Sequence, residues 1–145
     1  MDIIPMEARH LNAVLEIEIQ SFTLPWSRQS YTEELTKTGA FYFVALENSR
    51  VIGYIGMWHV VNEAHITTFA VSPEKRKCGA GTALLNHLVE TAAHLGTIGM
   101  MLEVRINNYD AQRLYFRKGF ILERIRKNYY SDTNEDALVL WKDFA

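Results

Sequence analysis

Residues 71–82 read Val71-Ser72-Pro73-Glu74-Lys75-Arg76-Lys77-Cys78-Gly79-Ala80-Gly81-Thr82. This stretch joins the end of an apolar, β-branched run to the start of an amphipathic helical pattern through a loop that contains glycines. A helix start leaves its first backbone N–H groups unpaired and carries partial positive charge, which suits an anion. Glycines let a phosphate approach the backbone, and Arg76 and Lys77 add positive charge. The stretch therefore predicts a phosphate-binding loop.

A plain strand-to-helix connection is the simpler interpretation, because Gly-x-Gly loops are common. The dinucleotide fingerprint Gly-x-Gly-x-x-Gly is excluded, since its third glycine would fall at Leu84. A P-loop is excluded as well, because the Gly-Lys-Ser/Thr ending is missing. The remaining interpretation is a loop that binds a nucleotide diphosphate on a different scaffold.

Hydrophobic periodicity predicts the other elements outward from this loop. Helices are expected at about 82–94 and 108–118 after the loop, the latter followed by Gly119. Before the loop we expect a strand at 2–4, helices at 8–21 and 27–39, and a meander of strands at 41–47, 51–61 and 64–71. The turn formers Asn48-Ser49 separate the first two strands of the meander. Strands at 98–104, 120–130 and 137–142 complete a mixed α/β sheet with helices on both faces.

Composition favours a single globular domain over residues 1–145. Apolar residues make up 48% and charged residues 22%, and the net charge of -2 argues against a nucleic-acid binder with a broad basic face. The one cysteine, Cys78, excludes an internal disulfide. The first residues lack an apolar signal core, and the longest apolar stretch, 51–61, is too short to span a bilayer. We therefore expect a cytoplasmic protein without a membrane partner.

Arg76-x-x-Gly79-x-Gly81, between a strand and a helix, resembles the acetyl-CoA pyrophosphate loop of the GNAT acetyltransferases. The order of elements also resembles the GNAT fold, a mostly antiparallel, splayed sheet. Other segments resemble the RimI group, the protein-N-terminal alanine acetyltransferases of bacterial ribosomes. These segments are Leu24-Pro25-Trp26-Ser27, Leu102-Glu103-Val104-Arg105 with Asn108, Leu114-Tyr115 with Gly119-Phe120, and Arg126-Lys127-Asn128-Tyr129-Tyr130 with Glu135-Asp136-Ala137.

The resemblance implies transfer of acetyl from acetyl-CoA to an N-terminal alanine, in this group that of the eighteenth protein of the small ribosomal subunit. The cofactor-binding residues that it implies are Phe69, Ala70 and Val71 for the pantetheine arm, Arg76, Lys77, Cys78, Gly79, Ala80, Gly81 and Thr82 for the pyrophosphate loop, and Asn108 for the cofactor arm. Cys78 stands where glutamine or glycine is usual, and Thr82 where arginine is frequent. Both positions contribute mainly backbone, so these departures affect affinity more than function.

The same resemblance makes Glu103 the general base and Tyr115 the general acid of a direct transfer. The chemistry needs both roles, because an α-amine of pKa near ~8 is mostly protonated at neutral pH and must lose a proton. The departing thiolate must gain one, and a phenol of pKa ~10 remains protonated to supply it. From the residues alone, a solvated strand residue is the favoured interpretation of Glu103 and a core aromatic that of Tyr115, and the resemblance reverses both preferences.

Aromatic side chains are the candidates for the peptide side of the site, namely Trp26, Tyr31, Tyr129 and Tyr130, although each also suits a core position. The histidines show no metal-ligand spacing, so no metal is expected. Cys78 has no base near it in sequence, which argues against covalent catalysis. Two alternatives remain open: a GNAT enzyme acting on lysine side chains or small amines, and a non-catalytic acyl-CoA-binding module.

Overall fold

A seven-stranded sheet forms the centre of the computed structural model, which describes residues 1–144. Its order is β1-β2-β3-β4-β5-β7-β6, and every neighbouring pair is antiparallel except the parallel pair β4–β5. The strands are β1 (Asp2–Pro5), β2 (Ala40–Glu47), β3 (Arg50–Val60), β4 (Glu63–Val71), β5 (Gly99–Arg105), β6 (Ile121–Tyr130) and β7 (Glu135–Asp143). The helices are α1 (Leu11–Ser21), α2 (Arg28–Leu35), α3 (Ala80–His94) and α4 (Tyr109–Arg117), with single 3-10 turns at Ala8–His10 and Pro73–Lys75. The predicted mixed, mostly antiparallel sheet is confirmed.

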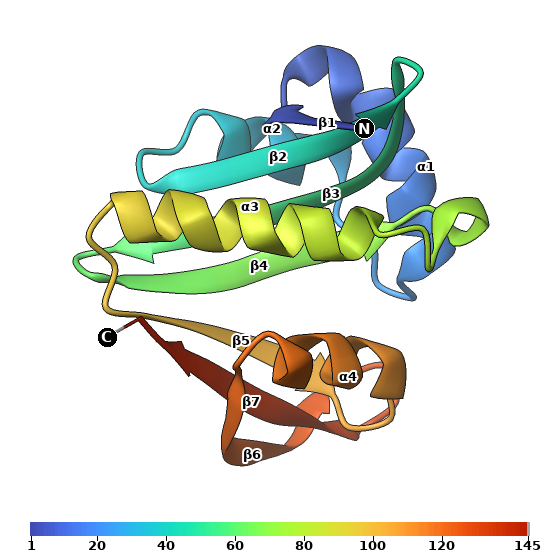
Figure 1. The fold of residues 1–145 in the computed structure, drawn as a ribbon. Helices are drawn as coiled ribbons and strands as arrows, with labels where there is room; N and C mark the ends of the chain where they lie inside the picture. The colour runs from blue at the N-terminus through green and yellow to red at the C-terminus, as the bar shows by residue number, and fades with distance from the viewer. Residues whose placement is uncertain (145) are drawn as a thin grey trace.

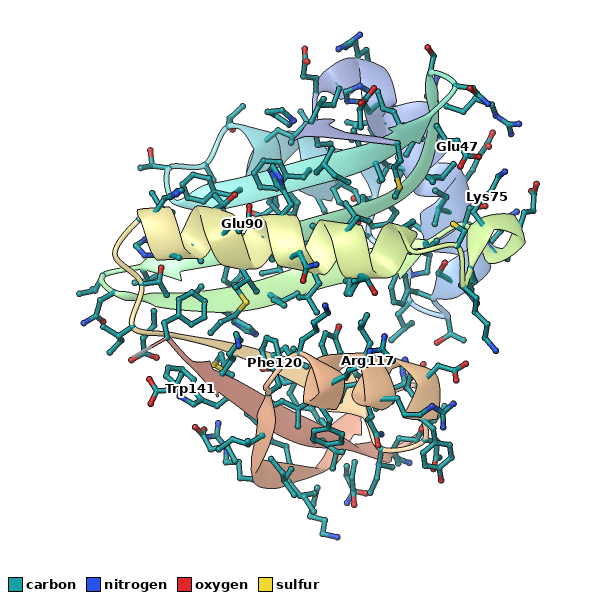
Figure 2. All side chains as sticks on the ribbon, viewed as in Figure 1. Glu47, Lys75, Glu90, Arg117, Phe120 and Trp141 are labelled. Atoms are coloured by element: carbon teal, nitrogen blue, oxygen red, sulfur yellow. The ribbon has the colours of Figure 1, made fainter. Side chains whose placement is uncertain are left out.

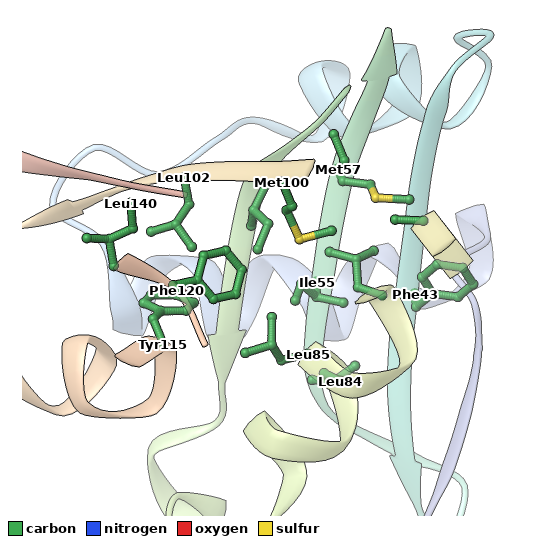
Figure 3. Packing of buried hydrophobic residues seen from close by; sticks show 14 of the residues in the cluster. Phe43, Ile55, Met57, Leu84, Leu85, Met100, Leu102, Tyr115, Phe120 and Leu140 are labelled. Carbon is green, nitrogen blue, oxygen red and sulfur yellow. The ribbon is translucent and has the colours of Figure 1, made fainter. Parts of the chain in front are cut away.

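The helices cover both faces of the sheet, with α3 and α4 on one face and α1 and α2 on the other (Figure 1). Under α3 and α4, apolar side chains from both helices and from strands β2 to β5 and β7 form one buried cluster (Figure 3). Under α1 and α2, a second cluster holds Leu11, Val14 and Ile17 of α1 together with Tyr31, Tyr42 and Tyr54. The amphipathic stripes of the helices thus account for a core on each side of the sheet.

Strands β4 and β5 are paired over only three positions, Glu63 to Gly99, Ala64 to Met100 and His65 to Met101. Beyond these pairs the two strands part, while β4 stays paired with β3 and β5 stays paired with β7. The part of the molecule made of β5, β6, β7 and α4 consequently diverges from β1 to β4 (Figure 1). The sheet is open at its centre between residues 66–71 of β4 and 102–105 of β5.

A β-bulge in β4 lies next to this opening. Gly56 of β3 is paired with Thr68 and Met57 with Ile66, so Thr67 is an extra residue in the ladder. Because side chains alternate with a period of two, the insertion turns Thr67 and Thr68 to the same face. Both hydroxyls meet tyrosines of the cluster beneath α1 and α2. The following Phe69 is turned toward the cluster beneath α3.

Element boundaries agree with the sequence to within a few residues. Asn48 and Ser49 have φ of 51° and 66°, as a tight hairpin turn requires, and Gly119 after α4 has φ of 92°. Helix α2 is shorter than predicted: it ends at Leu35 rather than near residue 39. The residues that follow include two threonines and Gly39, whose φ of 84° is not helical. Among the helices within residues 1–144, none is long and apolar enough to cross a membrane.

Gly56, opposite the bulge, allows the ring of Tyr42 to lie directly on the backbone. A Cβ added at Gly56 would lie 2.0 Å from Tyr42 Cε1. We predict that Gly56→Ala lowers the free energy of unfolding by about 3 kcal/mol, because a buried ring would have to move. Urea unfolding measures the change. Gly81→Ala is the control, because its Cβ would meet its nearest neighbour at an ordinary 3.6 Å. Equal stability of the two variants would contradict this packing.

Candidate functional site

Helix α3 starts without a capping side chain. Gly79 precedes it in the left-handed conformation, with φ of 91°, and the first turn contains no acidic residue. By contrast, Ser27 caps α2 through a bond from the Ser30 N–H, and Asn108 caps α4 through a bond from the Ala111 N–H. The first N–H groups of α3 are therefore left to an external anion, as the sequence predicted from the glycines.

The basic residues of the loop before α3 have different partners. Arg76 donates to the carbonyl of Val71 at 3.2 Å and to the Ser21 hydroxyl at 3.4 Å, so its guanidinium ties the loop to β4 and α1. Lys75 forms an ion pair with Glu47 at 2.8 Å (Figure 2). Lys77 remains exposed, with a left-handed φ of 64°. Cys78 is also exposed. Lys77 and the first N–H groups of α3 are therefore the groups of this loop that can contact an anion.

The start of α3 meets β4 and α4 at one point. A Cβ added at Gly81 would lie 3.6 to 3.7 Å from side-chain atoms of Phe69, Leu114 and Val71. The ring of Phe69 is 6.2 Å from that of Tyr115 on α4. The structure thus brings the predicted pyrophosphate loop, the predicted pantetheine strand and Tyr115 together on the face that carries α3 and α4. The backbone of residues 69–71 lies at the opening of the sheet.

Asn108 has a local structural role that the sequence analysis did not include. Its side-chain oxygen accepts the Ala111 N–H at 3.3 Å and thereby caps α4. The residue is exposed, so its amide nitrogen remains available for a ligand. A capping role and a ligand-binding role are compatible, because they use different atoms.

Glu103 lies on the opposite face of β5 from the core. Its neighbours Leu102 and Val104 are 1% and 5% exposed and belong to the cluster beneath α3 and α4. The Glu103 carboxylate bonds with His65 Nε2 at 2.7 Å and lies 3.9 Å from a guanidinium nitrogen of Arg126. Its side chain is 11% exposed, so the carboxylate is held in place yet still reachable.

His65 is a site residue that the sequence analysis missed. It was grouped with histidines lacking metal-ligand spacing, and nothing in its local pattern points to Glu103. The link is the parallel register: His65 is paired with Met101, two residues before Glu103 and on the same face of the strand. Only the pairing of β4 with β5 reveals that the two side chains meet.

Tyr115 lies on the core side of the opening. It is 6% exposed, and its ring centroid lies 5.6 Å from that of Phe120 (Figure 3). Burial raises the pKa of the Tyr115 phenol, and the neighbouring Tyr130 contributes in the same direction. A phenol in this position keeps its proton at neutral pH, which is the state that a proton donor needs.

The turn between β6 and β7 is tied to both β5 and the loop after α1. Arg105 forms an ion pair with Asp132 at 2.9 Å and lies 4.0 Å over the ring of Tyr130. The Thr23 hydroxyl donates to Asp132, which joins this turn to the loop at residues 22–27. Arg105 is the main cause that lowers the pKa of Asp132 to about 2. The carboxylate is therefore charged and holds its partners throughout the neutral range. Tyr129 is exposed beside Tyr130.

Two of the four aromatic candidates for peptide binding lie near the loop at residues 22–27. Trp26 is partly buried, with its ring centroid 5.0 Å from that of Tyr31. Tyr31 is 0% exposed and donates its hydroxyl proton to Glu18 at 2.6 Å. Tyr31 thus lies beneath the loop and Trp26 lies within it, whereas Tyr129 and Tyr130 lie at the end of β6. Within residues 1–144, no group of three or more His, Cys, Asp or Glu side chains is arranged to hold a metal ion.

The sequence of this chain resembles those of known proteins. The model of the acetyltransferase (GNAT) family matches residues 11–120. The chain belongs to the GNAT family. A Bacillus subtilis relative, named as a candidate ribosomal protein bS18-alanine N-acetyltransferase, is 39% identical over 137 residues, which cover 94% of this chain and 91% of the relative.

Solved structures show the same fold. The crystal structure of the ribosomal-protein-S18-alanine N-acetyltransferase from Escherichia coli superposes with a TM-score of 0.91 at 30% identity, covering 99% of this chain and 94% of that one. A candidate streptothricin acetyltransferase from Bacillus anthracis, in complex with acetyl coenzyme A, has a TM-score of 0.71 at 26% identity, covering 79% of this chain and 68% of that one. The predicted acetyl-CoA-dependent N-acetyltransferase of the RimI group is confirmed.

Proposed function

We propose that this enzyme acetylates the α-amine of an N-terminal alanine and that its substrate is ribosomal protein bS18. The relatives named for this reaction support the substrate. One observation supports the chemistry: Glu103 and Tyr115 lie on opposite faces of the sheet, on either side of the opening between β4 and β5. An amine can thus approach from one face while the thiol leaves toward the other.

The residues around the opening fit acetyl-CoA, which supplies the acetyl group as a thioester. The uncapped start of α3 binds the pyrophosphate through its backbone N–H groups, with Lys77 adding charge. The free edge of β4 at residues 69–71 offers backbone groups to the pantetheine arm. The side-chain amide of Asn108 bonds the same arm.

Glu103 and Tyr115 then handle the two protons of a direct transfer. Glu103 accepts the proton that the attacking α-amine must lose, and His65 and Arg126 hold its carboxylate in position. Tyr115 donates its phenol proton to the departing thiolate sulfur. Cys78 takes no part as a nucleophile, because it lies in the pyrophosphate loop, which the pantetheine arm separates from the thioester.

The peptide enters on the Glu103 face, between the loop at residues 22–27 and the turn between β6 and β7. The bond from Thr23 to Asp132 joins these two segments; Trp26 belongs to the loop, and Tyr129 and Tyr130 end β6 just before the turn. Aromatic side chains with polar tips suit the binding of a flexible chain end.

A blocked peptide tests the choice of amine. An alanyl peptide carrying the bS18 N-terminal residues and a lysine should be acetylated once, at its α-amine. The same peptide with a blocked α-amine should release no coenzyme A. Comparable rates for both peptides would move the function to lysine side chains, and no turnover with either, despite acetyl-CoA binding, would favour a binding module.

The start of α3 provides the next prediction. Gly81→Val places a branched side chain between α3, Phe69 and Leu114, where the cofactor must approach the backbone. We expect the affinity for acetyl-CoA to fall by at least about tenfold, measured by calorimetry. Ala93→Val, at an exposed position near the other end of the same helix, is the matched control and should bind normally. Unchanged affinity in a folded Gly81→Val enzyme would exclude this loop as the pyrophosphate site.

The two catalytic roles predict different pH profiles. Glu103→Gln and Tyr115→Phe should each lower kcat/KM by about 10²–10⁴ at neutral pH. The Glu103→Gln enzyme should recover as the pH rises through the amine pKa near ~8, because the nucleophile then loses its proton unaided. The Tyr115→Phe enzyme should show no recovery, because high pH does not supply an acid.

The measurement is kcat/KM for the alanyl peptide from about pH 6 to about 9.5, a range that brackets the amine pKa. Glu123→Gln, which changes an exposed glutamate on β6, is the control and should behave as the unmodified enzyme. If both site variants bind acetyl-CoA and keep near-native rates at every pH, the two residues are structural and the mechanism is wrong.

A further inference from the structure

Glu18 of α1 is a carboxylate in the core with bonds in three directions. It is 1% exposed. One oxygen accepts from the hydroxyls of Tyr31 and Tyr54, both at 2.6 Å, and the other accepts from the backbone N–H of Trp26 at 2.9 Å. A buried carboxylate is tolerated only with such partners, since its charge has lost its water. The partners come from α2, β3 and the loop at residues 22–27.

One of these contacts extends to the bulge of β4. Tyr31 has a single hydroxyl proton, which it donates to Glu18. The 3.2 Å contact between Tyr31 and Thr68 must therefore carry the Thr68 proton toward Tyr31. Thr68 precedes Phe69, where the cofactor edge of β4 begins. A single carboxylate thus holds the bulge beside the cofactor strand with one oxygen and the main chain of the loop with the other.

Glu34 of α2 offers an internal comparison. It is 5% exposed and accepts from Tyr42 at 2.7 Å and from Trp58 at 2.5 Å, and Tyr42 in turn contacts Thr67 at 2.9 Å. The two glutamates are therefore alike in burial, in tyrosine partners and in reaching a bulge threonine. They differ in two respects: Glu34 forms an ion pair with Lys37 at 2.5 Å, and only Glu18 bonds to the main chain of the loop at residues 22–27.

We infer that Glu18 is a positioning residue that fixes the peptide-binding loop relative to the cofactor strand. Its bond to Trp26 holds one end of the loop, while the bond from Thr23 to Asp132 holds the other. The inference rests on the proposed function, in which the peptide lies against this loop. Glu18 touches neither substrate, and its effect on the reaction passes through Trp26.

Glu18→Gln distinguishes the bonds that one carboxylate oxygen forms with the tyrosines from the bond that the other forms with Trp26. Two phenol protons need an acceptor and the loop presents only one N–H, so the glutamine oxygen faces the tyrosines. Its amide group then faces the Trp26 N–H, and two donors cannot bond. The KM for the alanyl peptide should rise by about tenfold or more, since a charged hydrogen bond is lost. The KM for acetyl-CoA should change by less than about twofold.

Glu34→Gln is the matched control. It removes a carboxylate charge from a site of similar burial and also breaks the ion pair with Lys37, so it costs at least as many contacts, yet the peptide KM should stay within about twofold of the unmodified enzyme. Equal rises of the peptide KM in both variants, or no rise in Glu18→Gln, would overturn the inference, because the effect would then be a general loss of core stability.

Hydrogen exchange gives a readout that needs no variant. The Trp26 amide of the unmodified protein should exchange slowly for a loop position, because its proton is bonded to a buried carboxylate. Fast exchange of the Trp26 amide would contradict the inference that Glu18 holds the loop, even if Glu18→Gln fails to fold. If the wild-type enzyme binds acetyl-CoA but does not acetylate alanyl peptides, the proposed function fails. Slow exchange at Trp26 would still support the bond by which Glu18 holds the loop.

Discussion

Only three residue pairs, all between β4 and β5, join β1 to β4 with β5 to β7 in this sheet. Their small number determines where a reaction can take place. If β4 and β5 were paired along their full length, the sheet would be continuous and would separate its two helical layers completely. Because pairing stops at His65 and Met101, both layers can be reached from one opening. On either side of the opening, β4 stays paired with β3 and β5 stays paired with β7, so each half of the sheet keeps its own ladder.

The layer beneath α1 and α2 shows how the fold tolerates charge near this opening. Two glutamates lie in a core that leucine or methionine could fill, and tyrosines supply both the apolar area and the hydroxyl groups that the carboxylates need. Burial raises the pKa of Tyr31 and of Tyr54, so their protons stay fixed on the phenols. The network around Glu18, in which both carboxylate oxygens are bonded, specifies a single arrangement of helices and strands more strictly than apolar packing alone.

Local chemistry made much of the fold predictable. The hairpin at Asn48-Ser49, the helix end at Gly119 and the glycine loop before α3 each depend on a few adjacent residues whose conformations are restricted. The alternation around Glu103 likewise predicted that it faces away from the core, as the structure shows. These features could be inferred because the cause and the effect lie within one turn or one strand.

Features that depend on strand register could not be predicted from the sequence. The bulge at Thr67 arises from how β4 aligns with β3, and the contact between His65 and Glu103 from how β4 aligns with β5. Likewise, Glu18 falls at helical spacing after Leu11 and Val14, on the apolar face, but the groups that bond its carboxylate there are tyrosines of other elements. Tyr31 could not be assigned to core or surface from its sequence for the same reason.

Cys78 gives this enzyme a built-in attachment point. It is the one cysteine in the sequence, it is exposed, and it lies immediately before Gly79 at the start of α3. A thiol-reactive fluorophore would therefore label a single position without any engineering, next to the segment that receives the cofactor phosphates in the proposed mechanism. Emission from that dye would follow cofactor binding and release in real time, independently of which amine is acetylated.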